Sequence, residues 1–379
     1  MSDETKKLLD ELKSLVVINS HTYNKSGVDE VGVLVQDLLS DIPLEWEVTE
    51  SSIRGNYLCA KSKEWDSTKP TILLNGHMDT VFEKNWDWYE QGEKFYGPGS
   101  LDMKAGVIAM IEVVRRMHSE GNLKNVLILF TPDEEDGMHH IAKQKEYYAQ
   151  ADYAFIFEEG TRDQSAPSAK DRVIVVERKA LSFFTIELSG PGGHNAIMKK
   201  PEQRHSALLE MSRIIQELHA LSDYELGTLI NVGTIESGIS PNAIPQKAKI
   251  RVDIRYGNRD EVERIKIALA DILEPKDSAL EMHYEETLFY PSFDYTEKIG
   301  QFAEEVISIA NKLGLSMEKQ FRVSGSEANW ISYYNPGCIV LDGFGVIGSG
   351  DHSDREFFFI ESLEDSVQLG KTVIEKILL

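Results

Sequence analysis

The sequence has very little cysteine and no long apolar run. Only Cys59 and Cys338 occur among 379 residues, so neither a disulfide framework nor a cysteine zinc site is indicated, and we expect a reducing compartment. The longest stretch without Asp, Glu, Lys or Arg, Ala328 to Leu341, is too short for a membrane helix and contains Asn, Pro and Gly. The N-terminal residues are typical of an acidic amphipathic helix and lack the apolar core of a signal peptide. We therefore expect a cytoplasmic protein without a membrane span.

Positive charge is also scarce. There are 40 Lys and Arg residues against 63 Asp and Glu residues, which gives a formal net charge of −23. Such a balance repels nucleic acids and anionic membrane surfaces, and we find no local basic patch that would reverse it. The composition thus excludes nucleic-acid-binding, membrane, collagen-like and disordered classes.

The chain is long enough for two or three domains, and its pattern changes twice. The apolar runs TILLNG from Thr71, VLILF from Val126 and YAFIF from Tyr153 alternate with helical stretches, which predicts a largely parallel α/β sheet with helices on both faces. Residues 179–289 follow the order βαββαβ, the split-βαβ or ferredoxin-like unit. The α/β pattern then returns. We predict one α/β domain, formed by 1–178 and 290–379, into which an α+β domain of residues 179–289 is inserted.

Polar residues follow the predicted buried strands, at the edge where ligands collect in open α/β sheets. These residues are His77, Asp79, Asp102, Glu134, Glu135, Glu158, Glu159 and His352. Taken singly, each could be a helix cap or a solvated loop residue, but the same chemistry recurs at successive strand ends. Two imidazoles and three carboxylates suit a pair of zinc ions, with cobalt or manganese as alternatives, and Asp102 is the natural bridge because it starts a helix. We expect His139 and His140 to lie on the surface, because adjacent residues on a helix do not share a face.

The motifs resemble a known family. NGHMDTVF, GPGSLDMKAG, TPDEEDG, FEEG, PGGHNA, NAIP, DIR and GSGDHSDREF are similar to blocks of the di-zinc peptidases and deacylases. That family includes glutamate carboxypeptidase, acetylornithine deacetylase, succinyl-diaminopimelate desuccinylase and aminoacylase. The blocks occur in family order from about residue 71 to the end of the sequence. The resemblance therefore implies a two-metal amidohydrolase.

The resemblance also implies a role for each matched residue. Asp102 would bridge the two zinc ions, with His77 and Glu158 completing one site and Glu135 and His352 the other. Asp79 would hold His77, and Glu134 would be the general base.

The inserted domain is implied to supply a second set of residues and to form a homodimer. His194 would stabilise the oxyanion in the partner subunit's site, and Asn242 and Arg255 would bind the substrate's carbonyl and carboxylate. Arg255 could instead be a surface charge paired with Asp253 or Glu236. Ser326 would line the substrate pocket, although Glu327 replaces the usual Asp of that loop.

We accordingly predict a zinc-dependent hydrolase that cleaves an amide bond next to a free carboxylate, most similar to the glutamate carboxypeptidase branch. An N-acyl-amino-acid deacylase such as acetylornithine deacetylase is the main alternative, with the same catalytic groups. A non-catalytic binding protein of the same fold is the alternative from another class. The complete set of candidate residues argues against it, because a binding protein could lose Glu134 or a ligand without harm.

Overall fold

The computed structural model describes residues 2–138, 144–162 and 168–378. His139 and His140 therefore lie outside the described residues. The chain forms two compact units: Met1–Glu177, Tyr295–Arg322 and Ser326–Leu379 make up the first, and Arg178–Asp294 with Val323–Gly325 the second. The sequence analysis places the boundaries at 178/179 and 289/290 and assigns the short segment 323–325 to the other domain.

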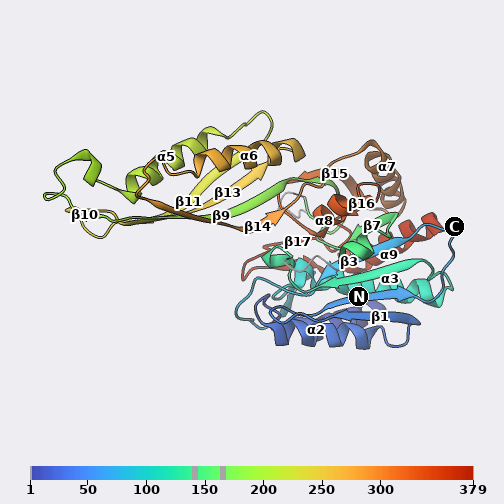
Figure 1. Ribbon diagram of the computed structural model, residues 1–379. Coiled ribbons are helices and arrows are strands. Elements are labelled where there is room, and N and C mark those ends of the chain that lie inside the picture. Colours follow the sequence, from blue (N-terminus) through green and yellow to red (C-terminus); the bar gives the residue numbers. More distant parts are fainter. Residues whose placement is uncertain (1, 139–143, 163–167, 379) are drawn as a thin grey trace. The chain divides into compact units, whose positions relative to one another are not determined.

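The first unit contains an eight-stranded mixed sheet in the order β1-β2-β6-β3-β7-β16-β8-β15 (Figure 1). The pairs β6/β3, β3/β7 and β7/β16 are parallel, whereas β2 and β8 pair antiparallel with their neighbours β6 and β16. The apolar runs that predicted a parallel sheet are β3, β6 and β7, and every residue of β3 and β6 is buried. The strands are β1 (Leu44–Thr49), β2 (Tyr57–Ser62), β3 (Ile72–His77), β6 (Val126–Thr131), β7 (Tyr153–Ile156), β8 (Asp171–Arg178), β15 (Ser316–Arg322) and β16 (Ile339–Asp342).

Helices of the first unit pack on this sheet and on one another. They are α1 (Asp3–Val16), α2 (Lys25–Leu38), α3 (Ala105–Ser119), α4 (Gln144–Tyr148), α7 (Glu297–Lys312), α8 (Glu327–Tyr334) and α9 (Ile360–Leu378). The central helix α3 contacts β3, α1 and α9. Gly106 of α3 lies close to Phe157, the residue directly after β7. A Cβ atom at position 106 would be 2.0 Å from the carbonyl oxygen of Phe157. Among the described residues, no helix is both long and apolar enough to cross a membrane.

A small antiparallel sheet in the first unit joins segments that are far apart in sequence. Its order is β17-β18-β5-β4, with β4 (Tyr89–Gln91), β5 (Lys94–Tyr96), β17 (Gly348–Ser349) and β18 (Phe357–Phe359). Phe358 lies opposite Phe95 in the β18/β5 pair. This pairing brings the turn between β17 and β18 next to the loop that follows β5.

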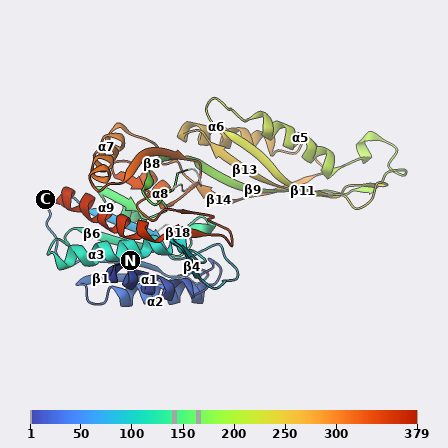
Figure 2. The same cartoon turned by 180° about the vertical axis from the view of Figure 1, so that it is seen from behind.

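The second unit is an antiparallel sheet with two helices on one face. Its strands β9 (Ala180–Ser189), β11 (Leu229–Ser237), β13 (Lys247–Tyr256) and β14 (Glu281–Tyr290) have the spatial order β11-β13-β9-β14. Helices α5 (Ala207–Ala220) and α6 (Arg259–Ile272) lie side by side on this sheet (Figure 2). Alternate residues of the strands, among them Ile186, Ile250 and Ile254, form the core with the apolar stripes of both helices. Chain order and strand order together are those of the ferredoxin-like unit.

Candidate metal centre

Three neighbouring parallel strands deliver four of the candidate residues to one edge of the sheet. His77 is the last residue of β3, and Glu134 and Glu135 start the short helix η2 (Glu134–Asp136) after β6. Glu158 lies two residues beyond the end of β7. Because the carboxyl ends of parallel strands meet at the same edge, residues separated by about 80 positions in sequence become neighbours.

Asp102 enters the same edge from the loop before α3. It lies in η1 (Ser100–Lys104), where its backbone is not helical and its peptide bond to Met103 is cis. One carboxylate oxygen, Oδ1, is 2.9 Å from Nε2 of His77. The other oxygen, Oδ2, is 3.1 Å from Nε2 of His352. The two oxygens of Asp102 thus face two different imidazoles.

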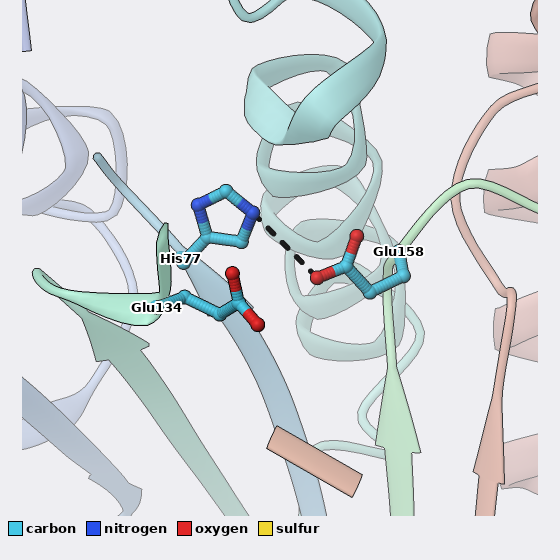
Figure 3. A group of neighbouring side chains, drawn as sticks. All are labelled: His77, Glu134 and Glu158. Atoms are coloured by element: carbon cyan, nitrogen blue, oxygen red, sulfur yellow. Dashed lines mark ion pairs between the residues drawn. The ribbon is translucent and has the colours of Figure 1, made fainter. Parts of the chain in front are cut away.

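The remaining carboxylates divide between these imidazoles. Glu158 Oε1 lies 3.6 Å from Nε2 of His77, and Figure 3 shows the carboxylates of Glu134 and Glu158 around this ring. Glu135 Oε2 lies 3.2 Å from Nε2 of His352. Among the described residues, two groups of side chains have ligand atoms within 4.8 Å of one another: His77 with Glu134 and Glu158, and His77 with Asp102 and Glu135.

Asp79 supports both the ligand and the turn that carries the acidic pair. Its Oδ1 is 3.4 Å from Nδ1 of His77 and accepts a hydrogen bond from the backbone N–H of Glu134 at 3.1 Å. Its Oδ2 accepts from the N–H of Glu135 and from the hydroxyl of Thr22. The side chain is fully buried. His77 Nδ1 also lies 3.0 Å from the backbone carbonyl oxygen of Asp79, so this residue orients the imidazole through its backbone and side chain and fixes the start of η2 through its carboxylate.

The flanks of η2 are held by residues that the sequence analysis did not identify. Tyr57 donates its hydroxyl hydrogen to Oδ1 of Asp133 at 2.5 Å, and Arg54 donates from Nε to Oδ2 of Asp136 at 3.1 Å. Both donors come from the segment 54–57, about 80 residues before η2. Hydrogen bonds between side chains so far apart in sequence leave no periodic pattern by which they could be predicted.

Glu356 was also missed, and it supports the loop that carries Asp102. Its buried carboxylate accepts hydrogen bonds from the backbone N–H groups of Gly99, Leu101 and Asp102. Burial raises the pKa of Glu356 to about 8, and these hydrogen bonds oppose the rise. The available signal was a single acidic residue directly before the apolar run FFFI.

The electrostatics of the cluster are dominated by buried carboxyl groups. Burial raises the pKa of Glu134 well above its usual value, with His77 opposing the rise and Glu327 adding to it. Burial and the charge of Asp102 raise the pKa of Glu135 to about 7 and that of Glu158 well above its usual value. Burial and the nearby negative charges thus make each of these carboxyl groups harder to ionise than a carboxyl group in water.

The two imidazoles shift in the opposite direction. Hydrogen bonds to Asp102 and Glu135 raise the pKa of His352 to about 11. Burial opposes protonation of His77, but its hydrogen bonds with Asp102 and Asp79 outweigh burial and raise its pKa well above the usual value. Burial acts to raise the pKa of Asp102 too, yet the two histidines hold it below its usual range.

This donor set fits divalent metal ions. Oε1 of Glu135 is buried without a hydrogen-bond partner, and so is Oε2 of the neighbouring Glu327. Buried carboxylates are stable only when paired or coordinated, and here they outnumber the imidazoles. Imidazole nitrogens and carboxylate oxygens without cysteine are ligands that suit zinc, cobalt or manganese.

Ser326 and Glu327, which belong to the predicted pocket-lining loop, lie at the start of α8. Ser326 is fully buried; its hydroxyl donates to Oδ2 of Asp342 at 2.8 Å and accepts from the N–H of Ala328 as the N-cap of α8. Glu327 accepts a hydrogen bond from the hydroxyl of Thr131 at the end of β6. The Ser326 side chain thus contacts protein groups that stabilise the helix start.

The other predicted substrate residues belong to the second unit. His194 is exposed in β10 (Gly193–His194), which pairs with β12 (Ala243–Ile244), and the N–H of Asn195 donates to the carbonyl oxygen of Asn242. The structure therefore brings His194 and the exposed Asn242 together. Arg255 lies on β13, where its guanidinium donates to both carboxylate oxygens of Asp253 and to the carbonyl oxygen of Val323. This is the Asp253 pairing that the sequence analysis left open as an alternative.

The central strands of the sheet are parallel, and at their carboxyl ends lies a cluster of carboxylates in which Asp102 faces one imidazole with each oxygen. This arrangement is suited to metal-dependent hydrolysis. The chain belongs to peptidase family M20/M25/M40, whose sequence profile matches residues 73–376. This membership confirms the predicted resemblance to the peptidases and deacylases, and with it the prediction of a metallopeptidase-class enzyme that hydrolyses amide bonds.

Relatives with known names span nearly the whole chain. Carboxypeptidase G2 of Pseudomonas sp. (strain RS-16) is 23% identical over 387 residues, covering 98% of this chain and 90% of the relative. Succinyl-diaminopimelate desuccinylase of Rickettsia bellii (strain RML369-C) is 23% identical over 384 residues, covering 93% and 92%.

Solved structures share the fold. A tripeptidase from Staphylococcus aureus superposes with a TM-score of 0.79 at 20% identity, covering 99% of this chain and 98% of the other. A dinuclear metal-binding peptidase of family M20 from Bacillus subtilis superposes with a TM-score of 0.67 at 14% identity, covering 99% and 97%. The predicted α/β fold with a largely parallel main sheet is thereby confirmed.

Proposed function

We propose that the chain binds two divalent metal ions, with zinc as the first choice and cobalt or manganese as alternatives. His77 and Glu158 would hold one ion, Glu135 and His352 the other, and Asp102 would hold both. The observation that supports this assignment is that Oδ1 and Oδ2 of Asp102 lie 2.9 Å and 3.1 Å from the imidazoles of His77 and His352. A bridging carboxylate with one oxygen for each ion is what a two-metal hydrolytic site requires.

The proposed reaction is hydrolysis of an amide bond, with Glu134 as general base. Two bound divalent ions would polarise the substrate carbonyl and lower the pKa of water at the site. Glu134 would accept a proton from the attacking water and deliver it to the leaving amine. Its position directly before Glu135, on a turn fixed by Asp79, supports this role, because the base must be held next to the ligands.

We propose a peptide substrate with a free carboxylate next to the cleaved bond, as for a carboxypeptidase or dipeptidase. Arg255 would bind that carboxylate and Asn242 the carbonyl oxygen, while Ser326 would act on the pocket only through the start of α8. Similarity to carboxypeptidase G2 and to a tripeptidase supports a peptidase. Similarity to a desuccinylase supports the second candidate, an N-acyl-amino-acid deacylase.

The second unit is proposed to act as a lid and dimerisation domain of a cytoplasmic homodimer. His194 would donate a hydrogen bond to the oxyanion in the partner's site. Its exposure on a short ribbon next to Asn242 supports a role outside the core of its own unit.

The test is to measure metal content and hydrolysis together. Protein stripped with a chelator should lose activity and regain it with two equivalents of zinc, cobalt or manganese per chain. C-terminally free dipeptides and N-acyl amino acids, assayed side by side, separate the peptidase from the deacylase. Full activity in excess chelator, or with one ion per chain, would contradict the two-metal assignment.

A further inference from the structure

Glu356 occupies a position between the two loops that supply Asp102 and His352. Its carboxylate is fully buried, although the residue lies in a turn between two short strands. The turn precedes β18, whose partner strand β5 leads into the loop of Asp102. Glu356 is therefore attached to one loop by its backbone and contacts the other through its side chain.

The carboxylate accepts three hydrogen bonds from backbone N–H groups of the other loop. Oε1 accepts from Leu101 at 2.6 Å and from Asp102 at 3.0 Å, and Oε2 accepts from Gly99 at 3.0 Å. Three N–H groups within four residues converge on one carboxylate, as in backbone nests that bind anions. The backbone of Asp102 is thus fixed by a side chain that comes from about 250 residues further along the chain.

The backbone of Glu356 closes the turn that carries His352. The N–H of Ser353 donates to the carbonyl oxygen of Gly350, and the N–H of Glu356 donates to that of Ser353. His352 lies inside this turn with a φ angle of 57°, a left-handed conformation that non-glycine residues adopt only when the surrounding structure requires it. The side chain of His352 is 54% exposed, so packing alone does not fix it.

We propose that Glu356 is a positioning residue that sets the separation of Asp102 and His352, and with it the affinity for the metal ion held by His352 and Glu135. This inference rests on the proposed two-metal function. The imidazole of His352 and Oδ2 of Asp102 are 3.1 Å apart, and the two loops meet through the Glu356 carboxylate. A loop shift of a few tenths of an ångström would change the ligand geometry, because metal–ligand distances must be met within about 0.2 Å.

The variant Glu356→Gln changes the hydrogen bonding with almost no change in shape. Both oxygens of an ionised carboxylate accept hydrogen bonds, whereas an amide has one oxygen and one NH₂ group that only donates. Whichever way the amide is oriented, its NH₂ group faces at least one of the three backbone N–H donors. The loop must therefore move away from Glu356→Gln, while the volume of the buried side chain is kept.

The experiment titrates metal-free protein with Co²⁺ and follows the visible absorption of the bound ion. In Glu356→Gln the dissociation constant of one ion, the one assigned to His352 and Glu135, should rise about 10–100-fold, the usual effect of removing a residue that supports a ligand. Glu361→Gln is the matched control, since Glu361 lies five residues further along the chain and its exposed carboxylate forms an ion pair with Lys170. Its metal affinity should equal that of the wild type. With metal saturating, Glu356→Gln should keep its KM and lose kcat.

A purely structural role predicts a different result. In that case Glu356→Gln lowers the melting temperature of the metal-free protein but binds both ions with wild-type affinity, and the proposal is wrong. If Glu356→Gln does not fold, Glu356→Asp takes its place in the same titration, because its shorter side chain keeps both acceptors but reaches fewer N–H groups. Failure of the two-metal function itself is seen separately, as a wild-type protein that does not bind two ions.

Discussion

The residues assigned to metal and base chemistry differ from those assigned to substrate recognition in how they are held. His77, Asp79 and Glu158 are buried at the ends of core strands, and each is fixed by its neighbours in the cluster. His194 is exposed on β10 and Asn242 directly before β12; Nδ1 of His194 accepts a hydrogen bond from the N–H of Ala196, and Oδ1 of Asn242 accepts one from the hydroxyl of Ser240. The buried candidates at the strand ends are thus held by the core of the fold, whereas His194 and Asn242 lie on loops, where sequence can change with less loss of stability.

The largest effect should come from the acidic pair, because its two members are adjacent yet are assigned different roles. Glu134→Gln should lower kcat about 10²–10⁴-fold and leave metal content near that of the wild type, since it removes only proton transfer. Glu135→Gln should lose metal as well. Metal analysis with steady-state kinetics on both variants checks this, and equal metal loss in the two would reverse the assignment.

The second prediction tests whether His194 acts in the metal site of the partner subunit. His194→Ala should lose about 10²–10³-fold in kcat as an oxyanion donor is removed. Mixing it with Glu134→Gln, under conditions of subunit exchange, should make half of the dimers mixed, each with one intact site. The pool should then regain about a quarter of wild-type activity.

The control for this mixing experiment is each variant exchanged with itself, which should regain nothing. Exchange shown by a mass label without recovery would place His194 in its own subunit's site or outside catalysis. A strictly monomeric, fully active chain would remove the shared-site proposal altogether.

A smaller effect is expected at Arg255, whose guanidinium already binds Asp253. Arg255→Lys should lower kcat/KM about 10–100-fold for a substrate with a free carboxylate, as expected for a charged hydrogen bond of about 1.5–3 kcal/mol. The matching C-terminal amide should lose much less. Arg251→Lys on the same strand is the control. If kcat/KM falls equally for the acid and the amide, Arg255 does not bind the substrate carboxylate, and its role is the ion pair with Asp253.

The smallest effect on activity should come from Ser326. Ser326→Ala removes the N-cap of α8 and should lower the free energy of unfolding by about 1–2 kcal/mol, with KM unchanged. Thr296→Ala removes the cap of α7 in the same unit and should behave alike. Urea denaturation and KM measured on both variants decide this, and a KM that rises only in Ser326→Ala would return Ser326 to the substrate pocket.

The sheet and the ligand positions could be predicted from sequence for a simple physical reason. Continuous apolar runs such as β3 and β6 indicate buried parallel strands, and the polar residue after each run must lie at a common edge. His77, Glu134 and Glu158 follow from this rule. The position of Asp102 at a helix start already favours it as the bridge, but the assignment of His77 with Glu158 to one ion and of Glu135 with His352 to the other comes only from the family resemblance.

Residues that act through hydrogen bonds between distant loops could not be predicted in this way. Glu356, Tyr57 and Arg54 each contact a segment more than 70 positions away, and nothing in their local sequence specifies that partner. Ser326 shows the same limit, because the motif that suggests a pocket residue does not reveal that its hydroxyl caps α8 and bonds Asp342, 16 positions away. Local pattern predicts which element a residue joins, and long-range hydrogen bonding is settled only in the folded chain.

The close approach of Gly106 to Phe157 limits how this enzyme can be altered. With no side chain at 106, the first turn of α3 rests directly on the backbone that leads to Glu158, and a methyl group there would overlap the carbonyl oxygen. The helix that begins just after Asp102 and the strand that ends just before Glu158 are thereby kept at a fixed spacing. We therefore expect that directed evolution that leaves every candidate ligand unchanged can still weaken metal binding, by enlarging Gly106.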